Sequence, residues 1–415
     1  MSYVVSPKVK ELLEQIIALK EVQTALKFIE DDQDQTLENQ IELTKIEAPT
    51  FHEENKAKRY LEMFKDLGLE NAEIDSYGNV TGIRKGEGGK RKLVVEGHLD
   101  TVFPLGTVID PQIRDGKVYA PGICDDTRGL VVNLTVIRAL KAAGIKTGND
   151  ILFGGTVQEE GMGGLMGMKK LLEFNKDVTE CLCVDGFSAK GIVYQATGFR
   201  TCEVNFYGIG GHAYGAFGYM ANALHAASRA VAKIADFQVP ADPRTTFCVS
   251  NFHAGNDASI HAIVPKATIK FNFRSNSMEE LNKLDDRIKA AIQEACDEES
   301  ARWGADTITW DYKQYIDVGA GKQDEHAPIV EADHAVIEYL GYDPLWIQGG
   351  STNANVPISQ GIPALCLGLS DEDNKVHSLD EYFPIKDSYK GAQQALLLAL
   401  MLSGIAGKTD PLLEM

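Results

Sequence analysis

The chain has 415 residues, 44% of them hydrophobic and 24% charged, an ordinary balance for a globular protein of two or three domains. Its formal net charge of −19 makes nucleic acid an unfavourable partner, and its longest apolar run, 395–402, is too short to span a membrane. The seven cysteines form no CxxC pair and the charged N-terminus is unlike a signal peptide, so we expect a protein of the reducing cytoplasm.

Helices are predicted at the start of the chain. A Ser-Pro pair is typical of a helix start, and the apolar residues after it fall mostly on one face of a helix over 6–30. Two further helices are predicted over 35–47 and 53–67, the second of which ends at Gly68.

Strands and helices then alternate. The strands are predicted over 92–96, 151–157 and 181–184, and the helices over 128–143 and 165–174. This alternation predicts an α/β sheet covered by helices.

The pattern changes near residue 199, where a smaller α+β domain, 199–315, is predicted to interrupt the first domain. Its strands are predicted over 201–207, 247–252 and 267–274, and its helices over 220–236 and 277–303. Ser277 and Glu280 have the spacing of a capping box at the start of the longer helix. The α/β pattern resumes near 325, so the first domain consists of 1–198 and 316–415.

His98 and Asp100 stand two residues apart at the end of a predicted strand, so they share one side of an extended chain. A metal-bound imidazole usually donates its other N–H to a carboxylate, which fixes the ring. The pair therefore suits a metal ligand and its supporting acid, although a structural histidine capped by an aspartate has the same sequence.

Two pairs of adjacent acids come next along the chain. Helix capping explains Asp126, whereas Asp125 could bridge two cations with its two oxygens. Glu159 and Glu160 lie directly after an apolar strand, where unpaired carboxylates are costly. A metal ligand and a catalytic proton carrier would account for both glutamates, and an exposed loop is the alternative.

Asp185 and His377 are the remaining candidates. Asp185 ends an apolar strand and His377 lies near the C-terminus, and each is weak alone. Ligands bind beyond the carboxyl ends of strands in α/β sheets, so these clusters can converge. Imidazole and carboxylate groups together suit zinc.

These motifs resemble the co-catalytic zinc metallopeptidase family that includes peptidase T, glutamate carboxypeptidase, aminoacylase and succinyl-diaminopimelate desuccinylase. The likeness covers about residues 45–400, with five motifs in the family's order. Gly-His-Leu-Asp-Thr-Val-Phe, Gln-Glu-Glu-Gly and Val-Asp-Gly are most similar to peptidase T-like tripeptidases. The resemblance implies a mixed-sheet α/β catalytic domain with helices on both faces and an inserted lid or dimerisation domain.

The resemblance also implies a site for two zinc ions, with cobalt or manganese as alternatives. The implied ligands are His98, Asp125, Glu160, Asp185 and His377. Asp125 would bridge the two ions, with His98 and Asp185 on one and Glu160 and His377 on the other.

Further roles are implied by the same resemblance. Asp100 would orient His98, and Glu159 would be the general base. In the inserted domain, His212 of the Gly-Gly-His-Ala motif would stabilise the oxyanion, reaching the partner's site in a dimer, and Arg274 would hold a substrate carboxylate. The implied substrate loop contains Ser351, Thr352 and Asn353.

The chain departs from the family pattern at four places. Its helix-start motif reads Asp-Asp-Thr-Arg, whereas the motif of the family often contains Lys, and it has His261 where the lid often carries Asn. Residues 214–218 replace a segment that usually contains Pro, and the helix over 6–30 exceeds the usual start. The first of these touches the metal site, and the next two touch substrate recognition.

The expected function is hydrolysis of amide bonds in small peptides by a zinc-dependent aminopeptidase or tripeptidase, a homodimer formed through the lid. A carboxypeptidase or an N-acyl amino-acid deacylase would share the metal site and differ in the substrate pocket, so both stay open. A non-catalytic metal-binding member is the remaining alternative; loss of Glu159 or of a ligand would mark it, and none is lost.

Overall fold

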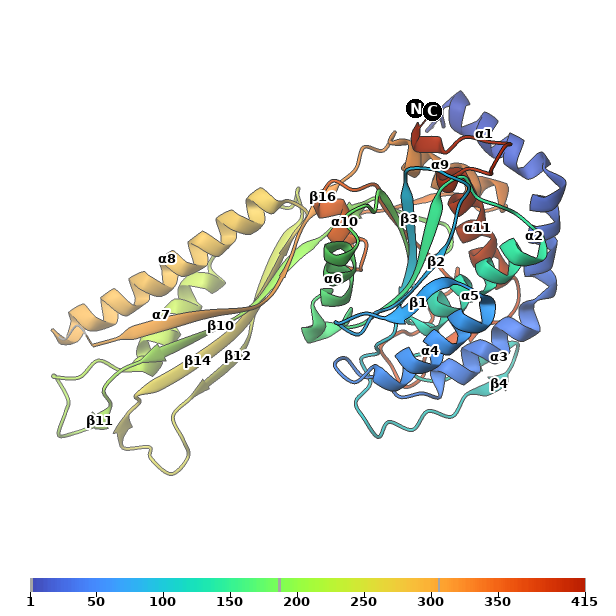
Figure 1. Cartoon of the computed structure of the whole chain (residues 1–415). Helices are drawn as coiled ribbons and strands as arrows, with labels where there is room; N and C mark the ends of the chain where they lie inside the picture. Colours follow the sequence, from blue (N-terminus) through green and yellow to red (C-terminus); the bar gives the residue numbers. More distant parts are fainter. Residues whose placement is uncertain (1–2, 186–187, 305–306, 415) are drawn as a thin grey trace. The chain divides into compact units, whose positions relative to one another are not determined.

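The computed structural model describes residues 3–185, 188–304 and 307–414. The chain forms two compact units: one contains the residues up to Ala196 and those from Lys322 onward, and the other is Thr197–Gly321 (Figure 1). The inserted unit is thus slightly longer than the predicted 199–315, because its first strand begins before 199 and its last strand continues past 315.

A mixed sheet forms the centre of the first unit, in the order β1-β2-β6-β3-β7-β18-β8-β17. These strands are β1 (Glu70–Ile74), β2 (Val80–Arg84), β3 (Lys92–His98), β6 (Asp150–Thr156), β7 (Glu180–Val184), β8 (Gly191–Val193), β17 (Leu345–Ile347) and β18 (Ala364–Leu367). Strand β3 runs parallel to β6 and β7, and β7 runs parallel to β18, whereas β1, β2 and β8 each have an antiparallel neighbour. Strands β3, β6, β7 and β18 are almost completely buried, as expected where both faces of a sheet are covered.

Helices cover both faces of this sheet, as the resemblance implies (Figure 1). Helices α5 and α11 pack on β3 from one side, and α6 packs on β6 from the other. The helices of this unit are α1 (Pro7–Ala18), α2 (Lys20–Asp31), α3 (Gln33–Thr44), α4 (Glu54–Leu67), α5 (Thr127–Ala142), α6 (Met166–Phe174), α9 (Pro328–Tyr339), α10 (Asn355–Ser359) and α11 (Tyr389–Ser403).

The single helix predicted over 6–30 is wrong, because α1 ends at Ala18 and α2 begins at Lys20. Leu19 between them has an extended ψ of 130°, which turns the chain. Each helix buries its own apolar face, so the apolar periodicity continues across the break without signalling it. The helix that ends at Gly68 is confirmed, with that glycine in the left-handed conformation at φ 81°.

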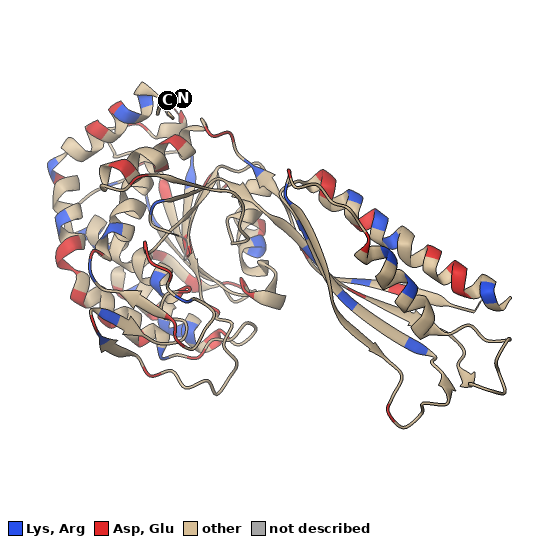
Figure 2. Ribbon diagram, turned by 180° about the vertical axis from the view of Figure 1, so that it is seen from behind, with Lys and Arg blue, Asp and Glu red and all other residues tan. Residues whose placement is uncertain are grey.

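The inserted unit is an antiparallel sheet in the order β12-β14-β10-β15, with two helices on it. Its elements are β10 (Gly198–Tyr207), α7 (Ala223–Ala235), β12 (Thr245–Ala254), β14 (Lys266–Ser275), α8 (Met278–Trp303) and β15 (Thr309–Val318). Acidic and basic residues are interspersed along α8, whereas the charged residues of α7 are the basic Arg229 and Lys233 (Figure 2). Only half of the predicted capping box forms: Ser277 caps the N–H of Glu280, but its own N–H donates to Ser275.

Short strands complete the fold. They are β4 (Gln112–Arg114), β5 (Lys117–Tyr119) and β19 (Tyr382–Pro384) in one small sheet, β11 (Gly211–His212) with β13 (Ala262–Ile263), and β9 (Gln195–Ala196) with β16 (Gly321–Lys322). All seven cysteines are free thiols, and Cys248 alone is exposed. In the part of the chain that the structure describes, no helix combines the length and the apolar character needed to cross a membrane.

Candidate active site

The predicted ligands lie at one edge of the central sheet. His98 is the last residue of β3, Glu160 comes after β6, and Asp185 comes after β7. Because β3 lies between β6 and β7 and runs parallel to both, their carboxyl ends meet at the same edge. Asp125 stands just before α5, and His377 lies in the segment between β18 and β19.

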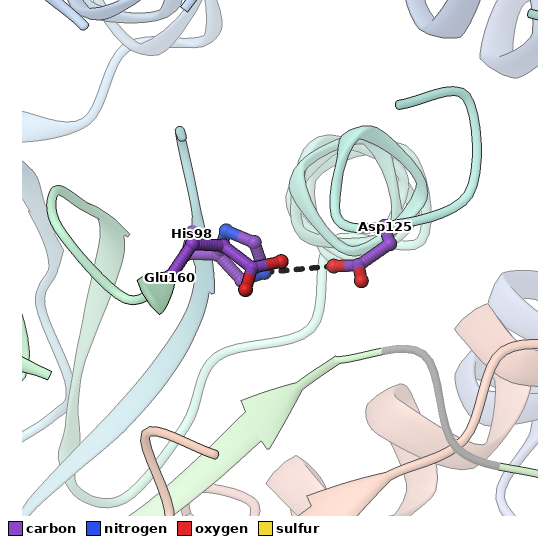
Figure 3. Close-up of side chains that lie close together, drawn as sticks. All are labelled: His98, Asp125 and Glu160. Carbon is purple, nitrogen blue, oxygen red and sulfur yellow. Dashed lines mark hydrogen bonds and ion pairs between the residues drawn. The ribbon is translucent and has the colours of Figure 1, made fainter. Parts of the chain in front are cut away.

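Asp125 lies between the two histidines (Figure 3 shows the first of these contacts). Its Oδ1 is 2.9 Å from Nε2 of His98, and its Oδ2 is 2.9 Å from Nε2 of His377. The same Nε2 of His377 lies 2.9 Å from Oε1 of Glu160. One carboxylate therefore presents a separate oxygen to each of two histidines, which is the arrangement that a bridging ligand requires.

The second partner of His98 is Asp185, whose Oδ1 lies 3.7 Å from Nε2 of the ring. Two ligand atoms bound to one tetrahedral zinc ion lie about 3.3 Å apart. The separations of 2.9 and 3.7 Å around His98 bracket that value. Potential ligand atoms of His98, Asp125 and Glu160 also lie within 4.8 Å of one another. The donor set therefore fits a metal ion in both its chemistry and its spacing.

Asp126 acts as a cap. Its Oδ1 accepts the N–H of Gly129 in the first turn of α5, and its Oδ2 accepts the N–H of His98. Its carboxylate also lies within 4.8 Å of His98 and Asp185 ligand atoms, but both of its oxygens are bonded to backbone groups. We therefore leave it out of the ligand set, in line with the helix-capping role predicted from the sequence.

Asp100 contacts the ring of His98, and it also supports the site in a second way. The ring Nδ1 of His98 lies 3.0 Å from the carbonyl oxygen of Asp100 and 3.5 Å from its carboxylate. The carboxylate mainly accepts the backbone N–H groups of Glu159 and Glu160, at 3.0 and 2.9 Å, and the hydroxyl of Thr50 at 2.9 Å. Asp100 thus fixes the strand end that carries the predicted base and a predicted ligand.

Burial and the closely spaced carboxylates of the cluster shift the pKa values of its members. Burial raises the pKa of Glu159 well above its usual value, and the charge of Asp185 adds to this. Burial acts to lower the pKa of His98, but hydrogen bonds to Asp100, Asp125 and Asp185 outweigh it and raise that pKa. Hydrogen bonds to Asp125 and Glu160 raise the pKa of His377 to about 10. Without a cation, protonated His98 and His377 balance the charge of the carboxylates. Bound metal ions would balance that charge instead.

A pocket of about 260 Å³ opens beside the ligands. Its lining residues are Asp125, Glu159, Glu160, Asp185, Ser351, Thr352, Val376 and His377. Ser351 and Thr352 therefore lie where the sequence predicted substrate-contacting residues. Asn353 does not line the pocket.

Asn353 is 1% exposed, and its amide donates to Glu96 Oε2 at 3.1 Å and to Thr156 Oγ1 at 2.8 Å. This placement does not fit the predicted contact of Asn353 with substrate. The residue anchors the 351–355 loop on β3 and β6 instead. Glu96 is not recognisable as a site residue from the sequence, because a single acid inside an apolar strand has no motif around it.

Glu381 is a second buried acid that the sequence did not reveal. Its carboxylate accepts the backbone N–H groups of Gly122, Cys124 and Asp125 at 2.8–2.9 Å. Glu381 stands only four residues after His377, and that spacing was the one signal available in the sequence. It ties the segment that carries His377 to the segment that carries Asp125.

The residues predicted in the inserted unit lie on its surface. His212 is exposed in β11, and its Nδ1 accepts the N–H groups of Tyr214 and Gly215 at 3.3 Å. Arg274 is on β14, with its guanidinium 4.8 Å from the ring centre of Phe199. His261 is also exposed, and its carbonyl accepts the N–H of Ala213.

Known proteins with similar sequences support the same assignment. The model of peptidase family M20/M25/M40 matches residues 94–401. The uncharacterised protein YqjE of Bacillus subtilis is 26% identical over 87% of this chain and 96% of its own length. A succinyl-diaminopimelate desuccinylase of Burkholderia cenocepacia is 26% identical over 80% of this chain and 91% of its own.

Solved structures are similar over most of the chain. The aminopeptidase PepT of Bacillus cereus matches with a TM-score of 0.73 and 25% identity, over 88% of this chain and 97% of that one. A tripeptidase of Staphylococcus aureus has the same fold, with a TM-score of 0.74 and 23% identity over 88% and 97% of the two chains. The predicted family and fold class are thereby confirmed. The chain belongs to peptidase family M20/M25/M40 and is a hydrolase.

Proposed function

We propose that this hydrolase is a two-zinc aminopeptidase that cleaves small peptides, of the tripeptidase kind. The observation that carries the proposal is the position of Asp125, whose two oxygens face His98 and His377 separately. A single metal ion needs no such carboxylate, whereas a pair of ions does. The likeness to an aminopeptidase and to a tripeptidase supports the peptide as substrate.

Five side chains would hold the ions. His98 and Asp185 are proposed for one ion, Glu160 and His377 for the other, and Asp125 for both. When bound, the ions supply Lewis acidity that polarises the amide carbonyl and lowers the pKa of water toward about 7. Cobalt or manganese would provide the same chemistry with the same nitrogen and oxygen donors.

Glu159 is proposed as the general base. It lines the pocket, and its backbone N–H is held by Asp100. A carboxylate there can take a proton from attacking water and return it to the leaving amine. Burial raises the pKa of Glu159 above its usual value, which makes its carboxylate a stronger base toward the proton of water.

The inserted unit would supply substrate contacts. We propose that His212 stabilises the oxyanion, from a second copy if the chain is a homodimer, and that Arg274 pairs with a substrate carboxylate. The exposure of both side chains supports a role toward a ligand or a partner. Ser351 and Thr352 would contact the substrate from the pocket wall. The reducing cytoplasm is the proposed location, since all seven cysteines are free thiols.

The second candidate is an N-acyl amino-acid deacylase or a carboxypeptidase with the same metal site. The 26% identity to a succinyl-diaminopimelate desuccinylase favours it. The two candidates differ in the group that must flank the scissile amide, since a deacylase needs an acyl chain and an aminopeptidase needs a free amine.

Purified protein reconstituted with zinc, cobalt or manganese would be assayed on tripeptides, on N-acetylated forms of the same tripeptides, on peptides ending in glutamate and on N-acyl amino acids. We expect release of the N-terminal residue from the free tripeptides only. Faster turnover of the N-acylated compounds would favour the deacylase, and no turnover of any amide at two bound metals would overturn the proposal. Light scattering on the same sample gives the oligomeric state.

A further inference from the structure

The three N-terminal helices have no part in the proposed chemistry, yet one of them reaches the metal-binding segment. Gln40 on α3 is fully buried, and its Nε2 donates to the carbonyl oxygen of Ile123 at 2.7 Å. Ile123 stands two residues before Asp125, the proposed bridging ligand. A side chain outside the motifs therefore holds the backbone beside that ligand.

The other end of the same amide holds Arg128. Oε1 of Gln40 accepts from Nη1 of Arg128 at 3.1 Å, and Nη2 donates to the carbonyl of Ser388 at 2.7 Å. The guanidinium lies 4.7 Å from the ring centre of Phe383. Arg128 thus connects α3, the first turn of α5 and the segment after β19. The planar guanidinium serves these two acceptors from two different nitrogen atoms, which the single nitrogen of a lysine does not offer.

The surroundings of Arg128 are unusual for a buried charge. The residue is 3% exposed, and both of its hydrogen-bond acceptors are neutral. Its Nε has no hydrogen-bond partner among the residues that the structure describes. A buried guanidinium without a direct counter-ion is costly, and core packing alone does not require one.

The segment 122–125 is consequently held from two sides. The carboxylate of Glu381 accepts N–H groups of this segment, and Gln40 donates to the carbonyl of Ile123. The position of Asp125 therefore depends on α3 as well as on the sheet.

We propose that Gln40, together with Arg128, is a positioning pair that holds Asp125 where both metal ions can share it. The inference rests on the proposed dinuclear site. It gives helix α3 a role, which is to hold the metal-binding segment through the side chain of Gln40.

Two variants of Gln40 test the pair. Gln40→Leu removes the donor and the acceptor, and Gln40→Glu keeps an acceptor for Arg128 while removing the donor to Ile123. The matched control is Thr36→Val, which removes a buried hydroxyl from the same helix without touching the segment 122–125. Gln35→Leu makes the same substitution at an exposed position of α3, so it shows the effect of replacing a glutamine of this helix by leucine outside the buried contact.

The zinc affinity of each full-length protein, first freed of metal, is measured by competition with a chelating dye. Urea unfolding gives the stability of each variant, and hydrogen exchange of the peptide that covers 120–128 reports how firmly that segment is held. We expect both Gln40 variants to bind the weaker zinc ion about tenfold less tightly, the typical effect of losing an outer partner of a ligand, and to exchange faster in that peptide. Thr36→Val and Gln35→Leu should bind zinc as the natural protein does, even where Thr36→Val lowers stability. With the best peptide substrate, the Gln40 variants should lose kcat at limiting zinc and keep KM.

Equal loss of zinc affinity in Thr36→Val and Gln40→Leu would overturn the proposal, because it would show a general weakening of α3. Unchanged exchange and zinc affinity in Gln40→Glu would do the same. If the natural protein bound no second zinc ion, the dinuclear site itself would be wrong, and the exchange of 120–128 would still decide whether Gln40 holds that segment.

Discussion

The carboxylate of Glu381 accepts the backbone N–H of Asp125 at 2.9 Å. Glu381 stands four positions after His377, so it fixes the aspartate that contacts both His377 and His98. The Glu381 carboxylate also accepts the backbone N–H groups of Gly122 and Cys124. The site is therefore held together by side chain to backbone bonds that lie behind the proposed ligands.

Glu381→Gln should destabilise the protein and loosen the metal site. A glutamine has one acceptor oxygen for three backbone N–H groups, and its own NH2 would face a donor. We expect a loss of about 1–3 kcal/mol in the free energy of unfolding, the typical cost of leaving a buried group unsatisfied, together with weaker zinc binding. Urea unfolding and a zinc titration would measure both. A variant with unchanged values would show that the three hydrogen bonds are dispensable.

Glu159→Gln should abolish most turnover while leaving the metal content intact. The variant keeps the size of the side chain and loses its ability to carry a proton, which typically costs about 10²–10⁴-fold in rate. Metal content after gel filtration and kcat on the best peptide substrate give the two readouts. Near-normal turnover would exclude Glu159 as the base. Glu173→Gln, at an exposed position on α6, is the control.

Asp125→Asn and Asp126→Asn should differ although the residues are neighbours. An amide offers only one oxygen and cannot bridge two cations, so Asp125→Asn should reduce the bound metal from two ions to one. Asp126→Asn keeps an oxygen for the helix cap but loses the acceptor of the His98 N–H, so it should retain both ions and lose about 1–3 kcal/mol of stability. Elemental analysis distinguishes them. Loss of metal by Asp126→Asn alone would reverse their assigned roles.

Asp333 should make stability fall as pH rises. It is fully buried on α9, with Gln394 donating to its Oδ1, and burial raises its pKa to about 7. Because the folded protein holds this proton more tightly than the unfolded chain, the stabilisation is complete below pH about 4 and is lost as pH rises to about 7. A shift of this size corresponds to at most about 4 kcal/mol.

Asp333→Asn removes that dependence while keeping the acceptor for Gln394. The variant should therefore be more stable than the natural protein at pH 8 and similar to it at pH 4. Urea unfolding at the two pH values checks this. An equal difference at both would mean that Asp333 does not titrate in this range.

Residue pattern predicts the elements that place the ligands, because buried parallel strands and capped helices are local features. His98, Glu160 and Asp185 are recognisable because each ends such a strand or follows it within a few residues. Glu96 and Glu381 are not, since their meaning depends on groups that are distant in sequence. The break at Leu19 escapes prediction for a different reason: both helices bury an apolar face, and periodicity does not register a change of direction.

The distribution of thiols gives an experimental opportunity. Six cysteines are buried, and burial raises their pKa, for example to about 11 for Cys202 and about 12 for Cys296. Thiolates react with maleimides and thiols do not, so these six should stay unmodified in the native protein. Cys248 on β12 is then a single natural attachment point for a fluorophore on the inserted unit. Movements of that unit during turnover can be followed without engineering a single residue of the metal site.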